Sequence, residues 1–251
     1  DEYIYITTTV AIASKYPIEN VHKVKPHIKS LQKHKFKRHF RFSRVPVKVD
    51  IRFKEDFIAT FYVCHLKSNR ENEFEYVFKA DNTLEDKKKS VSKALDLNFS
   101  ESLRIRLCEA SSLFFDMKKQ NNPFVLLCDL NDKEFSATIE ALTNEKYHDE
   151  SKKEYKILND AYYQLKRKIY NPHPEQKEIK RVPTSFFAGK GNVLDYIFVS
   201  KHFIKSYKKL FLIHKFLFLS QLLFSYQYKI IYTLDSFFVK KSKSQKTLFN
   251  Q

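Results

Sequence analysis

Three short, nearly uncharged runs of apolar residues constrain the fold of this chain more than any other feature of its sequence. They are FIATFYVCHL (57–66), PFVLLCDL (123–130) and VLDYIFVS (193–200). Runs of this kind are typical of strands that are buried on both faces in the middle of a sheet. Helices or a second sheet must cover each face of such a sheet, so the sequence predicts a domain of the α/β class.

Two upstream segments predict further strands. VPVKVDIRF (45–53) alternates apolar and polar residues, which predicts a half-buried strand that pairs with residues 57–66 as an antiparallel hairpin. VAIASKYPI (10–18) predicts a strand that ends at Pro17, because proline lacks the N–H that a ladder needs. The basic stretch that follows, up to Arg44, has no clear period, and we expect a loop or a weak edge strand there.

The segments between the strands predict two helices. Residues 67–98 are polar and charged, and we expect an irregular connection there. Ser100 is suited to cap a helix, and apolar residues then recur at intervals of three and four, which predicts a helix over 100–118. A second helix is expected around 137–144.

The positive charge of the chain is concentrated at its two ends. The net charge of the 251 residues is +17; residues 21–49 contain ten Lys or Arg and no acid, and residues 201–251 contain ten and a single acid. Such a surface attracts phosphate-rich partners, because binding releases counterions. A solvated lysine-rich surface without any partner explains the same composition equally well.

The cysteines and the hydropathy argue against several classes of protein. Cys64, Cys108 and Cys128 are far apart and form no CxxC spacing, which disfavours a zinc site and a disulfide framework. No signal peptide opens the chain, and no run of 18 uncharged apolar residues predicts a transmembrane helix. The compartment and the oligomeric state stay open.

Polar side chains lie where the three apolar runs end or begin. His65 lies near the end of the first run, Asp129 and Asn131 lie on either side of the end of the second, and Asp195 lies near the start of the third. Ligand sites gather at strand ends, because the sheet there is rigid and the backbone is free. Taken singly, each residue has a simpler explanation as a surface histidine or as turn chemistry.

These residue types suit the hydrolysis of phosphoesters. Carboxylates bind a hard divalent cation, and one of them can activate the attacking water. An amide and an imidazole can donate hydrogen bonds to phosphoryl oxygens as negative charge builds. Asp129 and Asn131 are two residues apart, so on an extended chain they are expected to point to the same side.

Five segments, in this order, resemble the endonuclease/exonuclease/phosphatase family, which includes DNase I and exonuclease III. They are VAIASKYPI (10–18), FSRVPVKVDI (42–51), HLKSN (65–69), LLCDLND (126–132) and VLDYIFVS (193–200). Arg104 or Arg106, on the helix expected before the Asp-x-Asn strand, fits a helix of the family. The resemblance covers about residues 10–200.

The resemblance implies a fold, a set of roles and a cofactor. The fold is a four-layer sandwich of two packed mixed sheets with helices outside. His65 would stabilise charge on the scissile phosphate, Asp129 would position or activate water, and Asn131 would hold phosphate or metal. Asp195 would orient a catalytic histidine further along the chain. The metal would be Mg²⁺, or Mn²⁺ in its place, bound through Asp129 and Asn131, and the substrate a phosphoester, with nucleic acid favoured.

The sequence also departs from the family pattern. The Gln-Glu motif that supplies a metal-binding Glu is expected upstream of residue 10, and no Ser-Asp-His follows Ser200. Cys128 stands where the family has glycine. We therefore expect residues 1–200 to be a partial family domain, incomplete at both ends. Residues 201–251 are expected to be a basic aromatic tail that does not match the family; an interfacial membrane helix at 210–224 is a weaker interpretation.

Two functional hypotheses follow from the sequence. The first is a metal-dependent phosphoester hydrolase, most simply a nuclease-type phosphodiesterase. The second is a catalytically inactive remnant of that fold, which binds nucleic acid or anionic surfaces through its basic ends.

Overall fold

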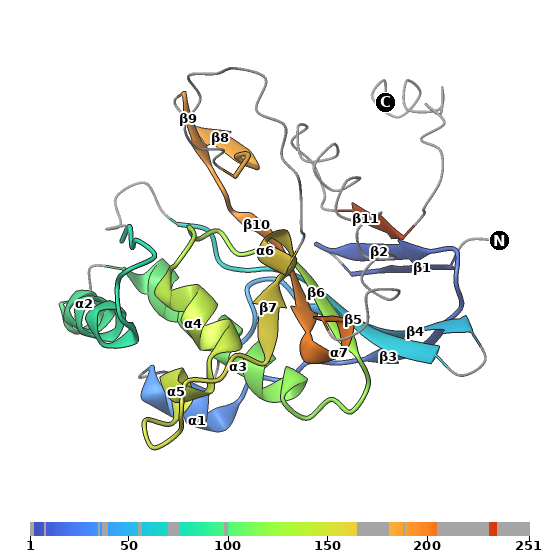
Figure 1. Cartoon of the computed structure of the whole chain (residues 1–251), viewed down its shortest axis with the longest axis horizontal. Helices are drawn as coiled ribbons and strands as arrows, with labels where there is room; N and C mark the ends of the chain where they lie inside the picture. The colour runs from blue at the N-terminus through green and yellow to red at the C-terminus, as the bar shows by residue number, and fades with distance from the viewer. Residues whose placement is uncertain are drawn as a thin grey trace.

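A six-stranded mixed sheet forms the centre of the protein in the computed structural model (Figure 1). The structure describes residues 3–7, 9–34, 36, 40–54, 57–69, 76–97, 100–164, 181–187, 189–204 and 231–234. In spatial order the strands are β3 (Ile18–His22), β4 (Val47–Lys54), β5 (Phe57–His65), β6 (Phe124–Asp129), β10 (Asp195–Ser200) and β7 (Leu158–Asp160). Strands β5 and β6 are parallel, and the other neighbouring pairs are antiparallel. The strands predicted at 45–53, 57–66, 123–130 and 193–200 are confirmed.

Helices cover one face of this sheet (Figure 1). The long helix α3 (Glu101–Met117) crosses it, with Leu107 and Phe114 packed in the same core as Tyr62 and Leu126 of the strands. Ser100 caps α3, as predicted, by accepting a hydrogen bond from the N–H of Leu103. The other helices of this layer are α1 (Ile28–Lys33), α2 (Leu84–Asp96), α4 (Ala137–Thr143) and α5 (Glu145–His148).

A smaller sheet covers part of the other face. It consists of β1 (Tyr3–Ile6), β2 (Ala11–Ser14) and β11 (Ile231–Leu234), in the order β1-β2-β11. Ile12 of β2 shares a second apolar core with Val47, Val49 and Ile51, the alternating residues of β4. The described residues thus form three layers of a mixed α/β fold, and helices outside the smaller sheet are not seen among them.

Two connecting segments contain more regular structure than their sequences predict. The connection 67–98 includes α2, whose first turn is closed by a reciprocal capping box between Thr83 and Asp86. That signal was present in the sequence, but the charged character of the segment obscured it. In the basic stretch before Arg44, the expected edge strand is present as the end of β3, and the short helix α1 was not expected.

A small hairpin leads into β10. It is formed by β8 (Ser185–Phe187) and β9 (Lys190–Asn192) and projects from the body of the protein in Figure 1. Both glycines of the chain lie in it. Gly189 has a φ of +75°, which favours glycine, and a Cβ on Gly191 would lie 2.5 Å from Pro183. The hairpin therefore depends on glycine at both positions.

Two short helices directly follow β7 and β10. They are α6 (Ala161–Gln164) and α7 (Lys201–Ile204). The expected interfacial helix at 210–224 lies outside the described residues. Within the described part of the chain, no helix has the length and apolar character required to cross a membrane.

Candidate active site

His65, Asp129 and Asp195 occupy neighbouring positions on three adjacent strands. In the parallel pair β5 and β6, His65 lies opposite Asp129. In the antiparallel pair β6 and β10, Asp129 lies opposite Asp195. Three residues that are far apart in the sequence therefore form one row at one end of the central strands, where β5 and β6 end and β10 begins.

The side chains of His65 and Asp129 are close but not strongly bonded. Nε2 of His65 lies 3.4 Å from Oδ2 of Asp129, which is longer than an ordinary N–H···O hydrogen bond. Both side chains are about four-fifths buried, with relative exposures of 24% and 18%. A reacting group could therefore reach them while most of the surrounding water is excluded.

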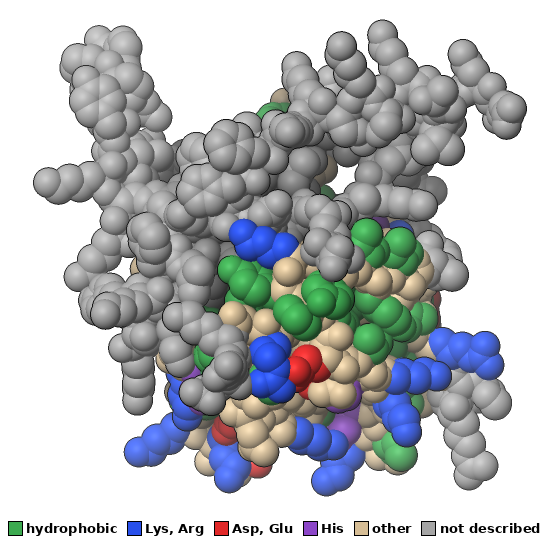
Figure 2. Space-filling model, turned by 90° about the vertical axis from the view of Figure 1, so that its right-hand side faces the viewer, with side chains coloured by type: hydrophobic (Ala, Val, Ile, Leu, Met, Phe, Trp, Pro, Cys, Tyr) green, Lys and Arg blue, Asp and Glu red, His purple; other side chains and the backbone are tan. Residues whose placement is uncertain are grey.

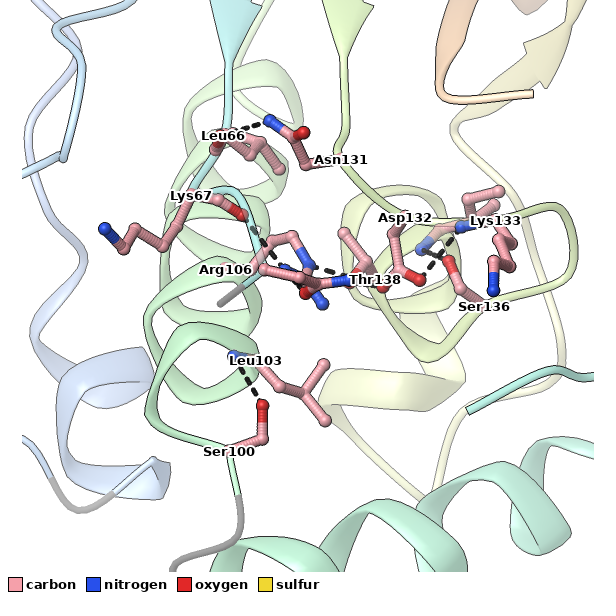
Figure 3. A network of polar contacts seen from close by, with 12 residues as sticks. Leu66, Lys67, Ser100, Leu103, Arg106, Asn131, Asp132, Lys133, Ser136 and Thr138 are labelled. Carbon is pink, nitrogen blue, oxygen red and sulfur yellow. Dashed lines mark hydrogen bonds and ion pairs between the residues drawn. The ribbon is translucent and has the colours of Figure 1, made fainter. Parts of the chain in front are cut away.

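Asn131 does not lie on an extended chain, so the expectation that it points to the same side as Asp129 for that reason is wrong. The strand ends at Asp129, and Asn131 has a φ of +48°, in the left-handed region that asparagine tolerates. Its N–H donates to Oδ1 of Asp129 at 2.8 Å. Its Nδ2 donates to the carbonyl oxygen of Leu66 at 3.0 Å, as Figure 3 shows. The turn thus joins the segment after β6 to the segment after β5.

Thr184 fixes the start of β10. Its Oγ1 accepts hydrogen bonds from the N–H groups of Leu194 and Asp195, at 3.0 and 3.1 Å. The backbone of Leu130 also donates to the carbonyl oxygen of Leu194. Asp195 is thereby held beside Asp129 by the residue that precedes the β8–β9 hairpin, and its described partner is a threonine rather than a histidine.

Burial shifts the pKa of all three groups in the row. It raises the pKa of Asp129 to about 6 and that of Asp195 to about 7, where the negative charge of Asp129 adds to the effect. Burial and the positive charge of Arg44 lower the pKa of His65 to about 4. At neutral pH His65 is uncharged, so its approach to Asp129 is not an ion pair.

The donor types at this end of the strands fit Mg²⁺ or Mn²⁺. Mg²⁺ is commonly bound by one or two carboxylates, while water and substrate oxygens fill its other positions. Asp129 provides a carboxylate and Asn131 an amide oxygen, since its Nδ2 is bonded to Leu66. A cation would also offset the repulsion between Asp129 and Asp195. In the described ranges, no group of three or more His, Cys, Asp or Glu is placed to share a metal ion.

Two arginines stand beside the row. Nη1 of Arg44 donates to the carbonyl oxygen of Leu66 at 2.8 Å, and its charge acts on both His65 and Asp129. Sequence reasoning missed this residue, although it lies in the FSRVPVKVDI segment. Of the two arginines considered on α3, Arg106 contacts the segments that follow β5 and β6, through Lys67 and Asp132; we call these segments the site loops. Arg104 instead donates to the carbonyl oxygen of Leu95.

No family model and no curated protein matches this sequence. The catalytic domain of human Nocturnin is similar in structure, with a TM-score of 0.41 and 15% identity over 74% of this chain and 49% of that one. A β-hairpin deletion mutant of beta toxin from Staphylococcus aureus gives 0.36 and 17%, over 78% and 57%. An endonuclease/exonuclease/phosphatase family protein from Bacteroides thetaiotaomicron gives 0.28 and 14%, over 66% and 45%. The chain spans about half the length of these structures.

Proposed function

We propose that this protein is a metal-dependent phosphoester hydrolase. The observation that supports it best is the row of His65, Asp129 and Asp195 across β5, β6 and β10. An imidazole and two carboxylates are brought together at one end of the central strands from three distant segments. Turn chemistry explains each residue alone, but it does not explain their common register.

Asp129 is the group that orients and deprotonates the attacking water. With a pKa of about 6 it is ionised at neutral pH and is still basic enough to take a proton. His65, which is uncharged at that pH, donates a hydrogen bond from its ring N–H to a phosphoryl oxygen as negative charge builds. Asp195 lies opposite Asp129 in the neighbouring strand, and the charge of Asp129 adds to the burial that raises the pKa of Asp195.

Asp129 and Asn131 are the residues that would hold Mg²⁺ or Mn²⁺. When bound, such an ion supplies a positive charge that stabilises the phosphoryl oxygens in the transition state. The backbone bond from Asn131 to Asp129 and the side-chain bond to Leu66 fix the orientation of both ligands.

The substrate class we favour is nucleic acid, which would make the enzyme a nuclease-type phosphodiesterase. The net charge of +17 favours binding of a polyanion. Ten basic residues lie in residues 21–49, and one of them is Arg44, which lies beside the site. Figure 2 shows a face on which Lys and Arg side chains are far more frequent than Asp and Glu. A cleavable phosphodiester and a positive surface are both expected of a nuclease.

A second candidate is an inactive domain that binds nucleic acid or an anionic surface through its basic ends. The described residues contain no cluster of three metal-ligating side chains, and this favours it. Binding without hydrolysis would then be the activity of the protein.

Hydrolysis assays separate the two candidates. Plasmid DNA and bis-p-nitrophenyl phosphate are incubated with the protein and Mg²⁺ or Mn²⁺, with and without EDTA, beside Asp129→Asn. EDTA-sensitive cleavage that the variant loses supports the hydrolase. Salt-dependent DNA binding by a folded protein that cleaves neither substrate supports the inactive domain instead.

A further inference from the structure

Glu109 of α3 is a fully buried carboxylate that bonds two separate segments of backbone. Its relative exposure is 0%. One oxygen accepts the N–H of Ser43 at 2.6 Å, and the other accepts the N–H of Lys67 at 2.8 Å. Burying a carboxylate costs free energy unless hydrogen bonds compensate it, and the burial raises the pKa of Glu109. An apolar residue would fill this part of the core at a lower cost in free energy, so the carboxylate of Glu109 calls for another explanation.

Arg106, one helical turn before Glu109, holds the same segment and a second one. Its Nη1 donates to the carbonyl oxygen of Lys67 at 3.0 Å and also to Oδ1 of Asn69. Its Nε lies 3.4 Å from Oδ2 of Asp132, a carboxylate that Thr138 also bonds at 2.6 Å (Figure 3). Arg106 is buried, with a relative exposure of 3%, so these contacts are shielded from water.

The segments held in this way are the ones that leave the sheet directly after the row of site residues. Lys67 follows His65 by two residues, and Asp132 follows Asp129 by three. The contact of Glu109 with Ser43 brings in a third segment, which carries Arg44. A single helix thus bonds the backbone next to His65 and Arg44 and the side chain of Asp132 next to Asp129.

We propose that Glu109 and Arg106 are positioning residues that set the spacing of His65 relative to Asp129 for the hydrolysis proposed above. Helix α3 is anchored in the core through Leu107 and Phe114, so it is a fixed reference for both loops. Hydrolysis requires a fixed spacing between His65 and Asp129, because a displacement of about 1 Å in a reacting group can lower a rate roughly 100-fold. This role rests on the proposed function, whereas the contacts of Glu109 and Arg106 do not depend on it.

Glu109→Gln tests the role with minimal change of shape. Glutamine replaces one of the two acceptor oxygens by an NH₂ group, so either Ser43 or Lys67 loses its acceptor and faces a donor. Arg106→Lys is a second variant, because lysine keeps the charge but lacks the planar fork that reaches both loops.

Glu140→Gln is the matched control. Glu140 is also a buried helical carboxylate, with a relative exposure of 5%, and it bonds Lys87 and Asn144 rather than the site segments. Glutamine there can still accept from Lys87, but its NH₂ group faces Nδ2 of Asn144, whose Oδ1 already accepts the N–H of Lys146, so one hydrogen bond is lost as at Glu109. This variant measures the effect of the same substitution away from the site.

We expect Glu109→Gln to lower kcat by about 10- to 100-fold and to change KM by less than about 3-fold. The amides of Ser43 and Lys67 should exchange hydrogen faster than in the parent protein. Glu140→Gln should keep the parent kcat and the protection of these amides, and Arg106→Lys should lie between the parent and Glu109→Gln. Equal losses of kcat in Glu109→Gln and Glu140→Gln, or a parent kcat in Glu109→Gln despite faster exchange, would overturn the proposal.

A readout without activity separates this proposal from the proposed function. If the parent protein hydrolyses no phosphoester, the function fails, but the His65 ring can still be followed by ¹H–¹³C NMR at fixed pH. A change in the chemical shifts of the His65 ring in Glu109→Gln, with unchanged shifts in Glu140→Gln, supports the positioning role. Ring shifts that stay in both variants overturn it.

Discussion

Asp195 lies directly opposite Asp129 in the antiparallel pairing of β10 with β6, so two largely buried carboxylates occupy neighbouring positions on adjacent strands. Burial makes the charged form of each less favourable, and the negative charge of Asp129 adds to the effect at Asp195. The pKa of Asp195 rises to about 7 and that of Asp129 to about 6. A pair of this kind destabilises the fold at neutral pH, and its presence is explained better by function than by stability.

Asp129→Asn is expected to abolish hydrolysis while the fold stays intact. Asparagine has nearly the same shape and can still accept the N–H of Asn131, but it cannot take a proton from water. Loss of a general base lowers rates by roughly 100- to 10,000-fold. Steady-state hydrolysis of bis-p-nitrophenyl phosphate checks this, with circular dichroism as the control for folding. Full activity in a folded variant would refute the site.

The rate should fall as the pH drops through about 6. Asp129 must be ionised to act as a base, and its pKa in the protein without metal is about 6. Below that value kcat/KM should fall about tenfold per pH unit. A bound cation favours the ionised form, so raising the Mg²⁺ concentration should move this limb to lower pH. Rates of bis-p-nitrophenyl phosphate hydrolysis between pH 5 and 8.5 test it, and a flat profile there would contradict it.

Asp195→Asn should stabilise the protein at pH 8. The folded protein raises the pKa of Asp195 to about 7 from its ordinary 3.8, so the ionised form is disfavoured in the fold. The resulting penalty is absent below about pH 4, grows as the pH rises to 7 and is constant above it. Asparagine removes the penalty, with an expected gain of up to about 4 kcal/mol. Urea unfolding at pH 8 and pH 4.5 measures this, and the idea fails if the gain is equal at both values.

His148→Gln should make stability less sensitive to acid. His148 stacks on Phe114 at a centroid distance of 4.1 Å, and burial lowers its pKa to about 3, with the charge of Lys33 acting in the same direction. Because the folded pKa lies below the unfolded value of about 6.5, its contribution is present above pH 6.5 and is lost as the pH falls toward 3. Glutamine does not titrate and can still donate to the carbonyl oxygen of Ala141.

The measurement for His148→Gln is the free energy of unfolding from pH 7.5 to 4. The variant should be less stable than the parent at pH 7.5 by roughly 1 kcal/mol, since the ring contact is lost. The difference should shrink below pH 6.5. Parallel curves for the two proteins over the whole range would show that His148 does not contribute to acid sensitivity.

Most of the central strands could be predicted from the sequence, because burial on both faces leaves a local record. The runs at 57–66 and 123–130 carry almost no charge, and the alternation of β4 matches its Val47, Val49 and Ile51 face in the inter-sheet core. Helix α2 was harder to predict, because its interior is dominated by charged residues that solvate its outer surface. Its capping box at Thr83 was the stronger local signal.

The sequence by itself determined the α/β class, the order of the strands along the chain and the residues that stand at their ends. These properties depend on local hydrophobicity and on residue type, which a single chain displays directly. Tertiary structure alone decided the register that aligns His65, Asp129 and Asp195, the left-handed turn at Asn131 and the grip of Arg106 and Glu109 on the site loops. Those contacts join segments up to about 130 residues apart in the sequence, and they form only because strand pairing and helix packing bring the segments together.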